Sequence, residues 1–252
     1  VLTIAAYQGR IMNTADSHII QEQIIAQAQA QVLGASLAGV ARTSDLKKSS
    51  SYLHYQKDPY YGSFQCFPEW PVEADSLLIL ALSHPQTASE MDWWDSRPGG
   101  TPGNRRLMDI QREMKVWLSE ALGIRSQSLF YRIESGGVFL KDAAALAGIG
   151  VIGANNLLLT PTFGPQVRLR AMFLFAEIEP TRPLDFDPCL HCERPCTSAC
   201  PQDAFRNGTY QRVYCQIQMR IDESNTKPLP ENSGTEHVRY CRACELACPV
   251  GR

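Results

Sequence analysis

The fold of this chain is decided near its C-terminal end, by CLHCERPCTSACP at residues 189–201 and CRACELACP at residues 241–249. Hydrophobic periodicity fades in this region and cysteine takes its place. Eight of the nine cysteines lie between Cys189 and Cys248, and Cys66 stands apart. Such a density suggests disulfides in a secreted protein and metal in a cytosolic one. The region is too rich in loops to fold on an apolar core of its own, so we expect inorganic ligands to hold it together.

The spacing of the cysteines favours iron–sulfur clusters. Bacterial ferredoxins use C-x2-C-x2-C-x3-C-P, in which the fourth cysteine serves the other of two clusters. The first stretch follows this pattern with one extra residue in its middle spacer, and a proline follows the last cysteine of both stretches. Two structural zinc ions or a disulfide framework are the alternatives. Zinc sites, however, usually show two C-x2-C pairs separated by a longer spacer.

Eight cysteines are the number that two four-cysteine clusters require. With the crossing found in ferredoxins, we expect two [4Fe–4S] clusters. One is expected to take Cys189, Cys192, Cys196 and Cys248, and the other Cys200, Cys215, Cys241 and Cys244. Cys66 is left over, and a buried thiol is its simplest interpretation. Two neighbouring clusters form an electron relay, so the residues upstream should hold what the relay feeds.

The composition is that of an ordinary globular chain. Its 252 residues are 44% hydrophobic and 20% charged, with a net charge of −2. This balance offers no basic field to a nucleic acid or to an anionic membrane. No apolar run is long enough to span a bilayer, and the N-terminus lacks the layout of a signal peptide. We therefore expect a cytoplasmic protein with neither a nucleic-acid nor a membrane partner.

Upstream of the cysteines, helical and strand-like patterns are mixed. The periodicity predicts helices over residues 17–33, 105–122 and 140–147, and strands over residues 35–41, 77–82, 129–133, 157–159 and 167–178. The tyrosine-rich residues 49–71 are expected to form a loop. A proline-rich passage at residues 181–188 marks a boundary. We therefore expect an α+β domain over residues 1–183 and a smaller domain over residues 184–252.

The most informative upstream stretch is KDAAALAGIGVIGANNLLLTPTFGPQ, at residues 141–166. Three glycines, followed by two asparagines, make a tight passage from helix to strand. Backbone N–H groups in such a passage can approach a bulky ligand. Close packing of the helix on the strand is an equally good explanation.

This stretch resembles the cobalamin-binding domains of the epoxyqueuosine reductases and the reductive dehalogenases, where AGLG-x-x-G-x-N-x-LLI precedes a glycine turn. LGASLAGVARTSDL (33–46), RVYCQIQMRID (212–222) and VRYCRACELACP (238–249) resemble further parts of that superfamily, in the same order. The resemblance implies a nitroreductase-like domain, a ferredoxin-like domain with two [4Fe–4S] clusters, and a cobalamin bound base-off, with its lower nucleotide detached. Carried over, the residues that line the corrinoid are Gly148, Gly150, Ile152, Gly153, Asn155, Asn156 and Leu157.

The chain departs from that superfamily at its proton donor. Epoxyqueuosine reductases place an aspartate in a D-S-x-P context, whereas RIESGGV puts Glu134 at the matching place. A carboxylic acid withdrawn from water can still deliver a proton, so we expect Glu134 to be catalytic. A solvated or ion-paired glutamate at a strand end is the alternative. This sequence shows no counterpart of the tRNA-reading repeats of the epoxyqueuosine reductases, nor of the twin-arginine signal of respiratory dehalogenases. We therefore expect a substrate other than tRNA.

The resemblance therefore implies an oxidoreductase. Electrons from a donor such as a ferredoxin or flavodoxin would pass through the clusters to cobalamin. The substrate would be a small organic molecule, or the corrinoid itself, reduced or stripped of its upper ligand. Two other functions stay open: an electron-transfer module that docks on another corrinoid or redox protein without binding cobalamin, and a flavin-dependent reductase, because a nitroreductase-like fold can host FMN.

Overall fold

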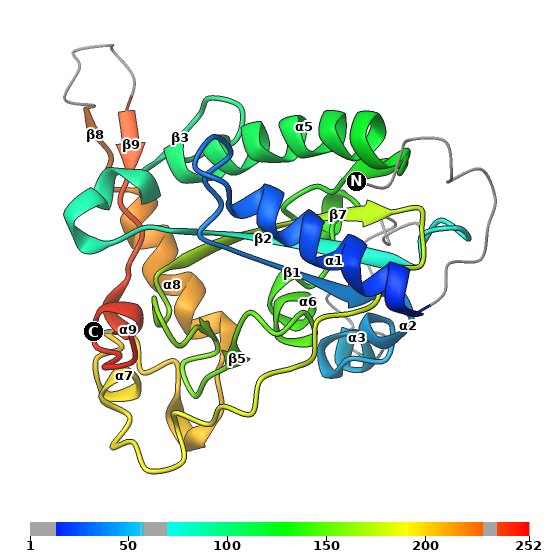
Figure 1. Ribbon diagram of the computed structural model, residues 1–252. Helices are drawn as coiled ribbons and strands as arrows, with labels where there is room; N and C mark the ends of the chain where they lie inside the picture. The colour runs from blue at the N-terminus through cyan, green and yellow to red at the C-terminus, as the bar shows by residue number, and fades with distance from the viewer. Residues whose placement is uncertain (1–13, 56, 58–69, 229–235, 252) are drawn as a thin grey trace. The chain divides into compact units, whose positions relative to one another are not determined.

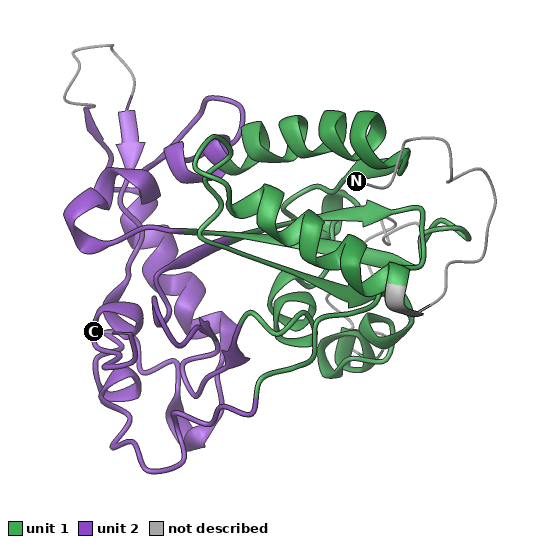
Figure 2. Ribbon diagram, in the orientation of Figure 1, with its two compact units in different colours: residues 1–82, 107–149, 169–184 green, residues 83–106, 150–168, 185–252 purple. Residues whose placement is uncertain are grey.

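The computed structural model describes residues 14–55, 57, 70–228 and 236–251 (Figure 1). The chain divides into two compact units (Figure 2). Unit 1 comprises residues 1–82, 107–149 and 169–184, and unit 2 comprises residues 83–106, 150–168 and 185–252. The predicted boundary after residue 183 lies next to the end of the last segment of unit 1. Two upstream segments nevertheless group with the cysteine-rich region in unit 2.

Unit 1 is built on a four-stranded sheet with the strand order β1-β2-β7-β4. The strands are β1 (Leu37–Arg42), β2 (Ser76–Ser83, whose last residue belongs to unit 2), β7 (Val167–Leu174, whose first two residues belong to unit 2) and β4 (Ser126–Ser128). β1 pairs antiparallel with β2, and β4 pairs antiparallel with β7. Seven of the eight residues of β2 are buried, as its continuous apolar run SLLILAL predicts for an inner strand covered on both faces.

The helices of unit 1 bury apolar faces. They are α1 (Thr14–Gln29), α2 (Thr43–Leu46), α3 (Ser50–Tyr55), α5 (Pro102–Leu122, whose first residues belong to unit 2) and α6 (Leu140–Leu146). On α5, Leu107, Ile110, Met114 and Leu118 are fully buried, which confirms the predicted amphipathic helix. α6 packs on β1 so closely that a Cβ at Gly39 would lie 2.2 Å from the carbonyl oxygen of Ala147. Glycine is therefore required at this crossing.

Two predictions about unit 1 are wrong. The tyrosine-rich loop begins as a helix, α3, because Tyr52 and Tyr55 bury their rings against Phe139, with centroids 4.8 and 5.5 Å away. The strand predicted over residues 129–133 lies earlier, at β4, where it pairs with β7. The chain then forms a short 3-10 turn, η3 (Ile133–Ser135). Cys66 lies outside the described residues.

Apart from helix α8, unit 2 contains only short elements. Its strands form the hairpin β5 (Val151–Ile152) with β6 (Leu158–Leu159) and a sheet in the order β3 (Trp94–Asp95), β9 (Glu236–Val238), β8 (Lys227–Pro228). Its helices are η2 (Gln86–Asp92), α7 (Pro195–Ser198), η4 (Arg206–Gly208), α8 (Arg212–Glu223) and α9 (Ala243–Leu246). Within the described ranges, neither unit has a helix whose length and apolarity would let it cross a membrane.

Candidate metal centres and cofactor site

The cysteine thiols of unit 2 fall into two groups. Burial, followed by the thiols of Cys248, Cys189 and Cys192, raises the pKa of Cys196. Burial, followed by the thiols of Cys241, Cys215 and Cys200, raises the pKa of Cys244 to about 12. All eight cysteines are free thiols. These two groups have the membership of the two predicted ligand sets, including the crossing of Cys248 and Cys200.

The thiol groups suit clusters better than single ions. Among the described side chains, no three of His, Cys, Asp and Glu are grouped so that they could hold one metal ion. A [4Fe–4S] cluster makes a different demand, because each cysteine binds a different iron at a corner of the cube. Both groups supply the four thiolates that such a cluster needs. Their role as ligands stays a prediction.

Backbone N–H groups point at three of these sulfurs. Ala154 donates to Cys189 Sγ at 3.4 Å, Arg194 to Cys192 Sγ at 3.4 Å, and Ala204 to Cys200 Sγ at 3.3 Å. Hydrogen bonds to cysteine sulfur stabilise the thiolate and are among the features that set the reduction potential of an iron–sulfur cluster. Both thiol groups therefore already carry polar contacts suited to a charged cluster.

The predicted corrinoid-binding passage forms the hairpin β5–β6 and its turn. Asn155 is 2% exposed, and its side chain accepts a hydrogen bond from the N–H of Leu157 at 3.1 Å. Its amide also donates to the carbonyl of Cys244 at 3.5 Å. The N–H of the neighbouring Ala154 donates a hydrogen bond to Cys189 Sγ, in the other thiol group. The turn therefore contacts both the group of Cys189 and the group of Cys244. Sequence reasoning did not reveal this link, because it depends on which loops meet.

The glycines of this passage are explained by packing within each unit. A Cβ at Gly150 would lie 2.4 Å from the carbonyl oxygen of Leu159, and one at Gly153 would lie 2.3 Å from the Leu159 side chain. In unit 1, a Cβ at Gly148 would lie 2.3 Å from the carbonyl oxygen of Arg182. Close packing, the alternative left open by the sequence, therefore accounts for all three. Ile152 differs, because its apolar side chain is 42% exposed and can contact a bulky apolar ligand.

Glu134 lies in unit 1, within the η3 turn. Its side chain is half-buried, and Gly136, which ends the turn, has a φ of 90°. The prediction that Glu134 ends a strand is wrong, because β4 stops at Ser128. A catalytic role for Glu134 stays a prediction.

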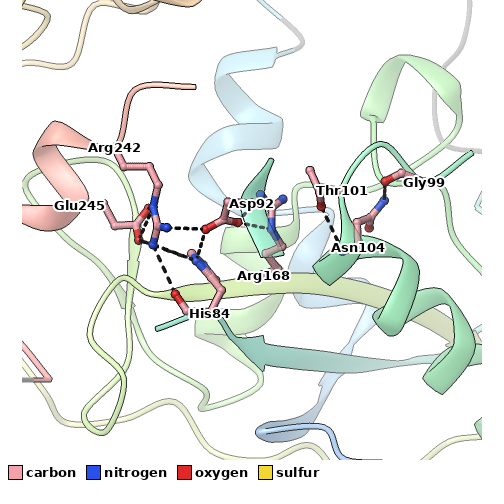
Figure 3. A network of polar contacts seen from close by, with 8 residues as sticks. All are labelled: His84, Asp92, Gly99, Thr101, Asn104, Arg168, Arg242 and Glu245. Carbon is pink, nitrogen blue, oxygen red and sulfur yellow. Dashed lines mark hydrogen bonds and ion pairs between the residues drawn. The ribbon is translucent and has the colours of Figure 1, made fainter. Parts of the chain in front are cut away.

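Unit 2 also contains a buried charge network that the sequence did not suggest (Figure 3). Asp92 Oδ2 lies 2.5 Å from His84 Nδ1 and 2.8 Å from Arg242 Nη1, while its other oxygen pairs with Arg168. Arg242 also pairs with Glu245. Burial opposes ionisation of Asp92, but the hydrogen bond to His84 and the charges of Arg168 and Arg242 outweigh it and lower its pKa. The partners lie far apart in the chain, so no local pattern could have predicted the network.

A cavity of about 340 Å³ lies beside this network. Its lining residues are Gln86, Ser89, Asp92, Trp93, Arg239, Tyr240, Arg242 and Leu246. The ring of Trp93 stacks on His237 with a centroid distance of 4.6 Å, and the guanidinium of Arg239 lies 3.9 Å from the centre of the same Trp93 ring. The second cysteine stretch is thus tied to η2 by the charge contact of Arg242, and the residues just before the stretch contact Trp93, at the end of η2, through aromatic contacts.

Comparison with known proteins gives a consistent set of relatives. The chain is 27% identical over 256 residues to the tetrachloroethene reductive dehalogenase of Sulfurospirillum multivorans, covering 87% of this chain and 48% of that protein. It is 26% identical over 197 residues to the epoxyqueuosine reductase of Bacillus subtilis, covering 71% of this chain and 48% of that protein. The chain thus spans about half the length of these curated relatives. No family model matches it.

Solved structures show the same mixed α/β fold. A Bacillus subtilis epoxyqueuosine reductase superposes with a TM-score of 0.62 at 21% identity, covering 95% of this chain and 66% of that one. In it, a catalytic loop that carries an aspartate is swung out of the active site. A catabolic reductive dehalogenase in complex with 3-bromo-4-hydroxybenzoic acid superposes with a TM-score of 0.65 at 17% identity. The match covers 97% of this chain and 34% of that one.

Other matching structures indicate what these relatives bind. One epoxyqueuosine reductase is seen with an epoxyqueuosine-modified tRNA stem loop. One reductive dehalogenase is linked to a B12-dependent mechanism of dehalogenation. The sequence matches to a reductive dehalogenase and to epoxyqueuosine reductases confirm the resemblance drawn from the sequence at the level of the superfamily.

Proposed function

The chain is related to the epoxyqueuosine reductases and the reductive dehalogenases, and from this premise we propose that it is a corrinoid-dependent iron–sulfur reductase. Two [4Fe–4S] clusters would pass electrons to a base-off cobalamin, and the reduced cobalt would supply the reducing chemistry. The substrate would be a small organic molecule or the corrinoid itself. The proposal includes a nitroreductase-like domain, a ferredoxin-like domain and a cytoplasmic location.

The observation that carries the proposal is the grouping of eight free thiols into two sets of four. A relay of two clusters needs an acceptor, and the relatives include a B12-dependent dehalogenase. In the proposal, Ile152 contacts the corrinoid through its exposed side chain. The turn formed by Gly153, Asn155, Asn156 and Leu157 supports it, together with Gly148 and Gly150. Glu134 would deliver a proton to the substrate, as the aspartate loop of the relative suggests.

A second candidate is an electron-transfer module that holds the clusters but no corrinoid. The packing of Gly148, Gly150 and Gly153 is compatible with it, because these glycines are needed whether or not a ligand is present. A flavin-dependent reductase is the third possibility. All three predict different bound groups, so cofactor analysis distinguishes them.

The decisive experiment is anaerobic reconstitution with iron, sulfide and cobalamin. The proposal predicts eight irons per chain, since each of two clusters holds four. It also predicts a retained corrinoid with a base-off spectrum. Two zinc ions with negligible iron would refute the clusters. Clusters without a corrinoid would favour the electron-transfer module. A flavin spectrum would favour the flavin-dependent reductase.

A pair of variants tests the site. Ile152→Arg should abolish corrinoid retention while leaving the iron content unchanged. Val72→Arg is the matched control, because Val72 is 98% exposed and lies in unit 1. Equal corrinoid retention by both variants would remove Ile152 from the site.

The absence of a nucleic-acid partner stays part of the proposal. It rests on the net charge of −2, and the tRNA stem loop bound by a relative stands against it. An electrophoretic shift assay with unmodified and epoxyqueuosine-modified tRNA stem loops tests it. A shift at physiological salt would overturn this part of the proposal.

A further inference from the structure

Arg170, on strand β7 (Figure 1) within unit 1, carries a buried guanidinium that has no carboxylate partner among the described residues. The residue is 6% exposed. Its Nη1 donates a hydrogen bond to the carbonyl of Leu129 at 2.8 Å, and its Nε is buried without any hydrogen-bond partner. Burial lowers the pKa of Arg170, and the nearby Tyr131 opposes this shift. A guanidinium nevertheless stays protonated in proteins, so a full charge lies inside unit 1.

Two other arginines of the chain show how such a charge is normally held. Arg168 pairs with Asp92, and Arg242 pairs with both Asp92 and Glu245. Burying a charge is costly unless a charge of opposite sign accompanies it. A buried polar group without a partner therefore calls for an explanation, and a ligand or ion that binds there is one. Arg170 has the character of one half of an ion pair whose other half comes from outside the chain.

The unbonded edge of this guanidinium fits a carboxylate. Nε and Nη2 lie side by side with parallel N–H groups, whereas the bond to Leu129 is made by Nη1 on the other side. Two parallel N–H groups match the two oxygens of a carboxylate. A single uncompensated charge also calls for a monoanion, because a phosphate dianion would bring a second charge into the same buried place.

Two exposed aromatic side chains follow directly in the loop that Arg170 contacts. Phe130 and Tyr131 come immediately after Leu129 and are 65% and 50% exposed. The N–H of Leu129 donates to the carbonyl of Ala171 at 3.0 Å, so the start of this loop is fixed alongside β7. Small-molecule sites combine apolar and aromatic side chains with a few polar groups that set the orientation of the ligand. An organic acid bound to Arg170 would find both kinds of group here.

We propose that Arg170 holds the carboxylate of a small organic acid, whose apolar body contacts Phe130 and Tyr131. The inference rests on the proposed function, because it names the class of substrate that the reductase takes. Glu134, the proposed proton donor, lies three residues after Tyr131 in the chain. A neutral substrate would leave the charge of Arg170 unpaired, whereas a carboxylate completes the ion pair. Binding makes no covalent bond and moves no electron.

Calorimetric titration of the full chain, loaded with clusters and cobalamin, tests the inference with phenylacetate as the probe. Phenylacetate carries a carboxylate on a small apolar body, and phenylacetamide is a neutral compound of nearly the same shape. We expect phenylacetamide to bind at least about tenfold more weakly, because it cannot complete the ion pair. Equal affinities would overturn the proposal, as would a wild-type chain that binds no phenylacetate. Chloride that binds in place of phenylacetate would also overturn it, since the charge would then belong to an inorganic ion.

A pair of variants assigns the binding to Arg170. Arg170→Met removes the charge and keeps an apolar stem, so its affinity for phenylacetate should fall at least about tenfold. Phenylacetate should raise the temperature of unfolding of the wild type but not of this variant. Arg112→Met is the matched control, because the Arg112 side chain is 71% exposed and pairs with Asp109. It should bind as the wild type does, and equal affinities in the two variants would refute the site.

Arg170→Lys keeps the proposal testable if the methionine variant does not fold. Lysine retains the charge but lacks the two parallel N–H groups of the guanidinium edge. This variant should bind phenylacetate more weakly than the wild type and still prefer it to phenylacetamide. An unchanged affinity, or a lost preference for the carboxylate, would contradict the proposed contact.

The failure of this inference can be told apart from that of the proposed function. Iron and corrinoid analysis of the same samples reports on the clusters and on cobalamin, neither of which depends on phenylacetate. A chain that holds eight irons and a corrinoid but does not distinguish phenylacetate from phenylacetamide would refute the carboxylate site alone. A chain that binds phenylacetate through Arg170 but holds no iron would refute the proposed function itself.

Discussion

Asp92 and Arg242 form a buried ion pair across 150 residues of sequence, with 2.8 Å between Asp92 Oδ2 and Arg242 Nη1. The pair fastens the second cysteine stretch to η2, and Arg168 and His84 share the same carboxylate. A buried pair of this kind adds little net free energy compared with an apolar one. Breaking it by removing a single partner is costly, because the remaining charge stays buried.

Asp92→Asn should therefore destabilise the protein by about 3–5 kcal/mol at neutral pH, since the partly buried Arg168 loses its carboxylate partner and Arg242 keeps only Glu245. Urea unfolding of the cluster-loaded chain measures this loss. Asp109→Asn is the control, because Asp109 pairs with Arg112 on the exposed side of α5. That variant should change the free energy of unfolding by less than about 1 kcal/mol.

Asp95 makes a pH-dependent contribution to the free energy of unfolding. Its side chain is 1% exposed; burial opposes ionisation, but hydrogen bonds from Arg97 and Arg105 lower its pKa to about 2. The unfolded chain therefore takes up the proton first as the pH falls. The stabilisation is present above about pH 4, where it amounts to about 2 kcal/mol, and is lost between about pH 4 and pH 2.

Asp95→Asn should accordingly be less stable than the wild type by a constant amount between pH 7 and pH 5. The difference should begin to narrow as the pH approaches 4. Urea unfolding at pH 7, 5 and 4 checks this, with the iron content followed in parallel. A difference that grows as the pH falls would contradict the assigned direction.

Asn155→Ala should weaken the connection between the hairpin turn and the second thiol group. The change leaves the N–H of Leu157 and the carbonyl of Cys244 without their partner, at a cost of about 1–3 kcal/mol. Thermal unfolding and the yield of reconstituted clusters measure the effect. Asn156→Gly is the neighbouring control, because Asn156 has a φ of 56°, which glycine adopts without strain. Equal losses in both variants would argue against a specific role for Asn155.

The crossing of cysteines between the clusters can be tested by pairs of variants. Cys200→Ala should damage the same cluster as Cys241→Ala, and Cys248→Ala should damage the same cluster as Cys189→Ala. Electron paramagnetic resonance of the partly reduced protein resolves the two signals. Damage that instead follows the order of the chain, with Cys200 grouped with Cys189, would refute the crossing.

Glu134→Gln tests the proposed proton donor. The amide keeps the shape and the hydrogen bonds of the side chain but removes the acidic proton, and general acids contribute about 10²–10⁴-fold. We expect the variant to keep both clusters and its cobalamin and to turn over a proton-requiring substrate more slowly by such a factor. Reduction of the bound corrinoid itself should be nearly unchanged. Normal turnover of an organic substrate would exclude Glu134 from catalysis, and loss of cobalamin would make it a structural residue.

Regular elements with a strong periodic pattern could be predicted from the sequence. The helix predicted over residues 105–122 is α5, and the apolar run at residues 77–82 is β2, each within a few residues of its expected bounds. Both signals are local, since they depend only on which neighbours along the chain are apolar. The assignment of the cysteines to two ligand sets came from the ferredoxin pattern with its crossing, and it stays a prediction.

Features that depend on distant partners could not be predicted. The helix that carries Tyr52 and Tyr55 is stabilised because Phe139 covers their rings. No residue near them in the sequence indicates that contact. Asp92 stands in a stretch rich in turn residues, which gives no sign of the arginines that surround it. For the same reason the sequence could not distinguish glycines that pack against Leu159 from glycines that make room for a ligand.

The pairing of β3 with β9 has a consequence for synthesis of the protein on the ribosome. Trp94 and Asp95 lie opposite Val238 and His237, so β3 must wait for most of the described chain to be translated before it finds its partner. Unit 1 needs nothing beyond residue 184 and can close earlier. Contacts of such high sequence separation form slowly and leave intermediates exposed. The cysteines of unit 2 are thus translated before β3 and β9 can pair, so the thiols stay accessible for an interval before Asp92 pairs with Arg242.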